Sequence, residues 1–177
     1  MKQFFSIFLA LTFFTTAQAE IKFKTVEYKQ GETALEGLSA YDDAIAGQRP
    51  GVLVVHQWKG LTDYEKKRAE MLAKLCYNVF AVDIYGKGVR PKDMKEAGAQ
   101  AGKYKEDRAL LRERVKAGLE ILKQNKLTDT KKIAAIGYCF GGTTVLELAR
   151  SGADISGVVS FHGGLSSPNP DDAKNIK

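Results

Sequence analysis

The feature that most constrains the fold is an alternation of short, unbroken apolar runs with helical patterns. Four such runs follow one another along the chain, at residues 51–55, 79–82, 133–136 and 158–161. Strands that are buried on both faces have continuous apolar sequences, whereas half-exposed strands alternate apolar and polar residues. Strands separated by helices form a parallel sheet with helices on both of its faces. The sequence therefore predicts an α/β fold.

Two weaker strands are expected before the first buried run. Residues 21–28 carry apolar side chains at nearly every second position among Lys and Glu, as in an exposed antiparallel edge strand. Residues 33–40 are a candidate for a second strand. Since no repeat or domain boundary is visible, residues 20–177 are expected to form a single domain with a mostly parallel sheet.

Helical patterns lie between the runs. Thr62 and Glu65 form a capping box, which begins a helix with Tyr64, Arg68 and Leu75 along one face. We expect further helices over residues 104–124 and 143–151 from their apolar spacing. Residues 84–103 are rich in Gly, Ala and Lys, and we expect them to form a long irregular loop.

The first nineteen residues have the features of a secretory signal peptide. A positive start with Lys2 precedes an apolar run at residues 4–14, and Ala17-Gln18-Ala19 gives the small-x-small pattern of a cleavage site. An apolar run of about eleven residues, at ~1.5 Å each, cannot cross a hydrocarbon core of ~30 Å. We therefore expect cleavage after Ala19 and a periplasmic or secreted product that is not bound to the membrane.

Composition narrows the classes of partner. The net charge is +6, but 27 basic and 21 acidic residues are interleaved rather than massed, which argues against a nucleic-acid partner. Two cysteines exclude a multi-bridge disulfide framework and a four-cysteine zinc site. Two histidines are too few for a histidine-rich metal site. Nothing in the sequence implies a metal or an organic cofactor.

The segment that carries chemistry is Gly137-Tyr-Cys-Phe-Gly141, between a buried strand and a helix. It has the spacing of a nucleophile elbow, with cysteine in place of serine. The central residue of an elbow lies in a strained turn, so a Cβ two positions away would collide with strand or helix, and Gly137 and Gly141 lack one. We expect the sulfur of Cys139 to face the first amides of a helix, which favour a thiolate. The alternative is a buried cysteine beside a glycine-rich turn.

A phosphate-binding loop is a rival interpretation of the same segment. Residues 137–142 have the Gly-x-x-x-x-Gly spacing and are followed by Thr143 and Thr144. Thr143 occupies the place of the lysine that would contact the β- and γ-phosphates. The sequence therefore disfavours nucleotide binding.

The elbow and the strand ends together resemble the dienelactone hydrolase family of α/β-hydrolases, which uses a cysteine nucleophile. Beyond the elbow, the resemblance covers most of the mature chain and runs through Gly51-Val-Leu-Val-Val-His-Gln-Trp-Lys-Gly-Leu-Thr-Asp-Tyr64, Arg68-Ala69 and Val79-Phe-Ala-Val-Asp-Ile-Tyr-Gly-Lys-Gly88. It implies an α/β-hydrolase sheet flanked by helices. It also implies hydrolysis of small-molecule lactones or carboxylic esters through a thioester acyl-enzyme.

The resemblance assigns roles to individual residues. Cys139 would be the nucleophile, and the amide of Phe140 one oxyanion donor, as elbow geometry also requires. The second donor amide would come from Trp58, whose side chain could equally be an aromatic cover on the core. Gln57 stands where the family commonly has a glutamate thought to govern the resting protonation of the nucleophile. Glutamine lacks the charge, so Gln57 is left only the role of ordering the loop.

The triad acid and histidine are not found among the candidates. His56 and His162 each follow a buried run, but the superfamily order is nucleophile, acid, histidine, and no strand-end acid precedes His162. Asp83 lies before the nucleophile, and Asp171 and Asp172 are interpreted as solvated surface. We expect the acid and the histidine beyond Lys177, in a fold that is truncated after the strand following the elbow. The alternative from another class is a non-catalytic binding protein, or an inactive fragment, with the same scaffold.

Overall fold

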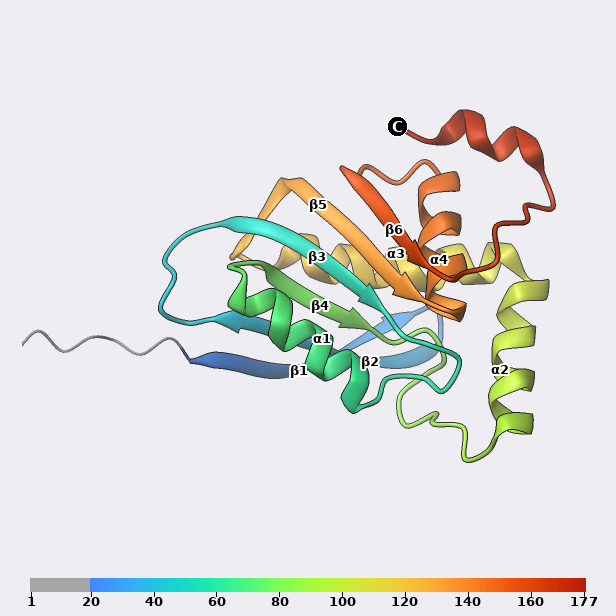
Figure 1. The fold of residues 1–177 in the computed structure, drawn as a ribbon, viewed down its shortest axis with the longest axis horizontal. Helices are drawn as coiled ribbons and strands as arrows, with labels where there is room; N and C mark the ends of the chain where they lie inside the picture. The colour runs from blue at the N-terminus through green and yellow to red at the C-terminus, as the bar shows by residue number, and fades with distance from the viewer. Residues whose placement is uncertain (1–19) are drawn as a thin grey trace, which may run out of the picture.

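The computed structural model describes residues 20–177, so the expected signal peptide lies outside the described residues. The fold is a six-stranded, mostly parallel sheet with strand order β1-β2-β4-β3-β5-β6 and helices on both sides (Figure 1). The predicted α/β class is confirmed. Within residues 20–177, none of the helices combines the length and the apolar character that a membrane crossing requires.

The strands lie close to their predicted positions. They are β1 (Ile21–Gln30), β2 (Thr33–Asp42), β3 (Arg49–Val55), β4 (Asn78–Val82), β5 (Thr128–Tyr138) and β6 (Gly157–Phe161). The helices are α1 (Asp63–Lys74), α2 (Met94–Glu106), α3 (Arg108–Gln124), α4 (Phe140–Arg150) and the short 3-10 helix η1 (Pro170–Asn175). β1 and β2 form an antiparallel hairpin that joins β4 through β2, and β4, β3, β5 and β6 run parallel.

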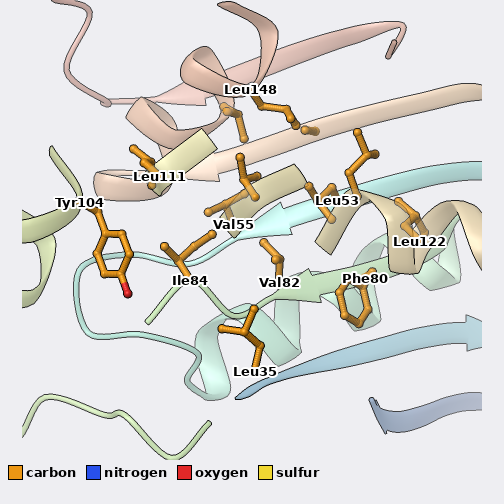
Figure 2. Close-up of a cluster of buried hydrophobic side chains, with 14 of the residues drawn as sticks. Leu35, Leu53, Val55, Phe80, Val82, Ile84, Tyr104, Leu111, Leu122 and Leu148 are labelled. Carbon is orange, nitrogen blue, oxygen red and sulfur yellow. The ribbon is translucent and has the colours of Figure 1, made fainter. Parts of the chain in front are cut away.

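The core has two layers, one on each face of the sheet. On β3, Leu53 and Val55 point to the α3 and α4 side, while Val52 and Val54 point to the α1 side. Figure 2 shows the larger layer, in which strand residues such as Phe80 pack against helix residues. Because β3 and β4 are buried on both faces, their continuous apolar sequences are explained. Their carboxyl ends are consequently rigid points from which loops can present functional groups.

A helix occupies part of the segment that was expected to be an irregular loop. Asp93 caps α2, because its carboxylate accepts a hydrogen bond of 2.8 Å from the amide of Glu96. The buried face of α2 consists of Ala97, Ala101 and Tyr104. These positions have helical spacing, but two of the three are alanines, whose weak hydrophobicity hides the pattern. The expectation of an irregular stretch over residues 84–103 is therefore wrong from residue 94 onward.

The single helix expected over residues 104–124 is also wrong. It is interrupted at Asp107, whose amide donates to the carbonyl oxygen of Lys103 at the end of α2. The carboxylate of Asp107 accepts from the amide of Leu110 at 2.9 Å and so caps α3. One residue ends one helix and begins the next, which lets the two helices diverge.

The sheet is not covered on both faces along its whole width. α1 begins with the predicted capping box, but it packs on the sheet through Ala69 and Ala73 and leaves Leu75 67% exposed. The helix lies over β2, β3 and β4. On the same side of β5 and β6, Val159 and Phe161 are 49% and 43% exposed. The expectation that helices cover both faces of the sheet is therefore wrong at the β5–β6 edge, within the described residues.

Candidate active site

Cys139 lies in a strained turn between β5 and α4. Its backbone has φ 55° and ψ −114°, and residues other than glycine rarely adopt a positive φ. Its carbonyl oxygen accepts from the amide of Gly142 at 3.0 Å, in the first turn of α4. The strand–turn–helix geometry expected of a nucleophile elbow is present. The side chain makes no capping hydrogen bond to α4, and the expectation that the sulfur faces the first amides stays a prediction.

The glycines of the elbow have the steric reason that their spacing predicted. A Cβ on Gly137 would collide with the carbonyl group of Gly141, and a Cβ on Gly141 would collide with the carbonyl oxygen of Val55. The structure adds Gly163, where a Cβ would collide with the backbone of Gly142. No signal in the sequence distinguished Gly163, because its contact joins the end of β6 to α4.

Phe140 is fixed by an aromatic cluster below the turn. It is the first residue of α4, and its amide donates to no acceptor within residues 20–177. Its ring is 1% exposed and stacks on the imidazole of His56, with centroids 5.7 Å apart and planes at 22°. The ring of Tyr85 lies 5.4 Å away. Within the described residues, a backbone N–H without an acceptor is therefore held beside Cys139 by a buried side chain.

The loop after β3 presents the other expected donor. The carbonyl oxygen of Trp58 accepts from the hydroxyl of Tyr85 at 2.9 Å, while the Trp58 amide donates to no acceptor in the described part of the chain. The amide of Gln57 donates to Glu65 at 3.3 Å. Gln57 is thus held by its backbone, and the expectation that Gln57 orders the loop stays a prediction.

Glu65 is a functional candidate that the sequence only half revealed. Its carboxylate is 1% exposed and accepts from the amide and hydroxyl of Thr62 at 2.9 and 2.7 Å, as the capping box predicted. The further bond to Gln57 depends on the fold, because it joins the start of α1 to the end of β3. Glu65 therefore closes the loop at both of its ends.

Tyr85 is a second candidate that sequence reasoning missed. Burial is the main reason that the pKa of its phenol is raised, and the neighbouring Tyr104 and Cys139 raise it further. The hydroxyl is therefore a neutral donor close to the elbow. It joins the loop after β4 to the loop after β3 through Trp58.

Asp83 fixes the loop that carries Tyr85. It is fully buried. Its carboxylate accepts hydrogen bonds from the backbone amides of Tyr85 at 3.1 Å, Gly86 at 3.2 Å and Glu36 at 3.1 Å. These bonds agree with the interpretation that Asp83 is not the triad acid. Asp172, by contrast, is not solvated surface: it pairs with Arg112, which also binds the fully buried Glu147.

The two histidines lie in different environments. His56 is fully buried, and both of its ring nitrogens are engaged: Nδ1 lies 2.5 Å from the carbonyl oxygen of Gln57, and Nε2 accepts from the amide of Ile84 at 3.2 Å. Burial lowers the pKa of His56, which keeps the ring neutral. His162 is exposed at the end of β6. Residues 20–177 contain no cluster of three or more His, Cys, Asp or Glu able to hold a metal ion.

A cavity of about 370 Å³ lies beside the loop after β3. It is lined by Gln57, Trp58, Thr62 and Glu65 and, from the start of α2, by Met94. Cys139 is not among the lining residues, so the cavity borders the expected oxyanion loop rather than the expected nucleophile.

Comparisons with known proteins agree with this geometry. The model of the dienelactone hydrolase family matches residues 35–177. The solved structure of m3DLH is 39% identical with a TM-score of 0.85, and that of the dienelactone hydrolase-like promiscuous phosphotriesterase P91 from metagenomic libraries is 39% identical with a TM-score of 0.84. Both alignments cover 89% of this chain and 65% of the other.

Among curated proteins, Protein usf of Aquifex pyrophilus is 32% identical over 133 residues, which is 72% of this chain and 57% of that protein. The chain thus spans little more than half the length of this relative. The residues that the family model matches contain all but the first two residues of β2 and every later strand, as well as the elbow and the loop after β3. On this evidence the chain belongs to the dienelactone hydrolase family.

Proposed function

We propose that the protein hydrolyses small lactones or carboxylic esters, with Cys139 as the nucleophile. The observation that carries the proposal is the strained turn at Cys139, which lies between a buried strand and a helix. Two backbone amides that find no acceptor among residues 20–177, those of Phe140 and Trp58, belong to the same end of the sheet. Membership of the dienelactone hydrolase family supports the same class of reaction.

The proposed reaction has two steps. The sulfur of Cys139 attacks the carbonyl carbon of the substrate, the bond to the alcohol oxygen breaks, and a thioester forms as the alcohol leaves with a proton. Water then attacks the thioester, which releases the acid and restores the thiol. In both steps the carbonyl oxygen becomes negative, and the amides of Phe140 and Trp58 would donate to it.

The proposal assigns no general base among residues 20–177. Both ring nitrogens of His56 are occupied, and His162 is exposed at a strand end with no acid assigned to it. The acid and the histidine that the family resemblance implies are therefore sought outside the described residues. We also propose that residues 1–19 direct export to the periplasm or medium, which the Ala17-Gln18-Ala19 pattern supports. Mass spectrometry of the exported protein tests this, and a retained Met1 would contradict it.

Release of p-nitrophenolate from p-nitrophenyl acetate tests the proposed hydrolysis. Cys76 is exposed just after the end of α1, and Cys76→Ala is the control. The wild type and this control should release a burst of about one equivalent. Cys139→Ala should release none. An equal burst from Cys139→Ala would overturn the assignment, and no burst from any of the three proteins would favour the non-catalytic binding protein.

A further inference from the structure

We infer that His56 is a positioning residue for oxyanion binding: its imidazole N–H holds the peptide between Gln57 and Trp58 so that the Trp58 amide faces the reacting oxygen. The inference rests on the proposed hydrolysis and adds to it the group that orients one donor. His56 touches neither the substrate nor the sulfur in this account. It acts through a peptide bond.

The geometry of that peptide carries the argument. Nδ1 of His56 lies 2.5 Å from the carbonyl oxygen of Gln57, and the amide of Gly60 donates to the same oxygen at 3.3 Å. The Gln57 carbonyl and the Trp58 N–H belong to one planar trans peptide, so they point in opposite directions. Two donors that hold the oxygen therefore also set the direction of the free N–H.

The imidazole is itself held in one orientation and one tautomer. Nε2 accepts from the amide of Ile84 at 3.2 Å, so the proton is assigned to Nδ1, which donates to Gln57. The ring is fully buried, and burial lowers its pKa, so the ring remains a neutral donor and acceptor. Tyr85 packs edge-on against the ring at 4.7 Å.

His56 also contacts the second donor residue. The ring of Phe140, whose own amide is the other expected oxyanion donor, stacks on the imidazole at 5.7 Å. A Cβ on Gly141 would collide with the carbonyl oxygen of Val55 and approach that of His56, so the start of α4 lies directly on this strand end. One buried side chain thus packs against both halves of the proposed oxyanion hole and fixes their relative position.

A hydrogen bond to a carbonyl oxygen also polarises its peptide. Such cooperative strengthening is about 10–30% per bond in condensed-phase estimates, and here it would strengthen the N–H of Trp58 as a donor. This strengthening of the donor adds to the effect of its orientation. It would matter only when negative charge develops on the substrate oxygen. A strand-end histidine that only satisfied one backbone group would neither orient the N–H of Trp58 nor polarise the peptide that carries it.

The test compares three substitutions that differ in where they place a donor. The amide nitrogen of His56→Asn can occupy the position of Nδ1 and donate to Gln57. The longer His56→Gln carries its amide to the position of Nε2, and His56→Leu has no donor. The rate of Cys139 acylation by p-nitrophenyl acetate is measured by intact mass, beside the rate of Cys139 alkylation by iodoacetamide, which forms no oxyanion.

Loss of one oxyanion donor costs about 10²–10³-fold, so misdirecting the Trp58 amide should slow acylation by about 10–10²-fold in His56→Gln and His56→Leu. Alkylation should change by less than about twofold, since it does not use the donor, and His56→Asn should recover most of the acylation rate. Thr128→Val, which removes a buried hydroxyl at the opposite end of β5, is the matched control and should leave both rates unchanged.

Equal losses of acylation in the Asn, Gln and Leu variants would overturn the inference, as would alkylation that falls in step with acylation. A wild type that is never acylated would instead refute the proposed hydrolysis. In that case the amide ¹⁵N and ¹H shifts of Trp58 decide the positioning role alone. They should be preserved in His56→Asn and moved in His56→Leu, and identical shifts in all variants would refute it.

Discussion

The amide of Cys139 donates a 2.9 Å hydrogen bond to the carbonyl oxygen of Phe161, at the point where β5 and β6 both end. The neighbouring ring of Tyr138 stacks on that of Phe161, with centroids 4.7 Å apart and planes at 8°. The strained turn is therefore a continuation of the β5–β6 pairing rather than a loop that follows it. Strain at such a position persists only where the surroundings hold it.

Substitution of Gly141 should destabilise the protein, because its Cβ would collide with the backbone at the end of β3. Overpacking of this kind costs about 1–3 kcal/mol in the free energy of unfolding. Gly98→Ala is the matched control, since a Cβ there meets nothing within 4 Å on α2 and should stabilise the helix by about 0.5–1 kcal/mol. Urea unfolding measures both. A Gly141→Ala protein as stable as the wild type would contradict the close packing of α4 on β3.

Substitution of Glu65 should loosen the loop that presents Trp58. Glu65→Ala leaves the amides of the half-buried Gln57 and the exposed Thr62 without their acceptor, so the loss of stability should be at or below the low end of the about 1–3 kcal/mol that a fully buried unsatisfied group costs. Glu70→Ala, in the same helix, removes only solvent-screened ion pairs with Lys67 and Lys74. Hydrogen exchange of the Gln57 amide should accelerate in Glu65→Ala and not in Glu70→Ala, and equal exchange in both would rule out the role given to Glu65.

The buried His56 predicts a loss of stability in mild acid. Burial lowers its pKa in the folded protein below the ordinary 6.5, although the bond to Gln57 and the charge of Asp83 oppose this. Below pH 6.5 the unfolded chain binds a proton that the folded protein does not, so the contribution of His56 is full above that pH and is lost as pH falls. The slope is at most about 1.4 kcal/mol per pH unit.

The difference in unfolding free energy between the wild type and His56→Asn isolates this effect, because the other titrating groups are common to both proteins. The difference should shrink as the pH falls from 7 to 5, measured by urea unfolding. A difference that is constant over this range would mean that His56 titrates equally in the folded and unfolded states.

Local patterns predicted the strands and the elbow, because each is a property of neighbouring residues. The run at residues 79–82 is buried on both faces, and Gly137 is required by its steric contact with Gly141, four residues further on. What failed was α2, whose buried face includes Ala97 and Ala101 and so carries little hydrophobic signal. A buried helix face that consists mainly of alanines gives almost no amphipathic signal in the sequence.

The contacts that build the site could not be predicted from local patterns. The bond from Tyr85 to Trp58 joins two loops that are 27 residues apart in the sequence. The two bonds of His56 depend on the pairing of β3 with β4. Strand-end position indicated which residues would meet at this edge of the sheet, but hydrogen-bond partners follow from the packed fold and not from spacing.

Mapping of the acyl group after reaction with p-nitrophenyl acetate tests the central claim, that the elbow cysteine is the nucleophile, most directly. The account assigns no general base among residues 20–177, because both ring nitrogens of His56 are engaged and no acid is assigned to His162, so deacylation should be slow and the acyl-enzyme should accumulate. We predict one acetyl group, located by peptide mass spectrometry on Cys139 and absent from Cys139→Ala. An acetyl group on Cys76 or on lysines alone, with Cys139 unmodified, would contradict the account.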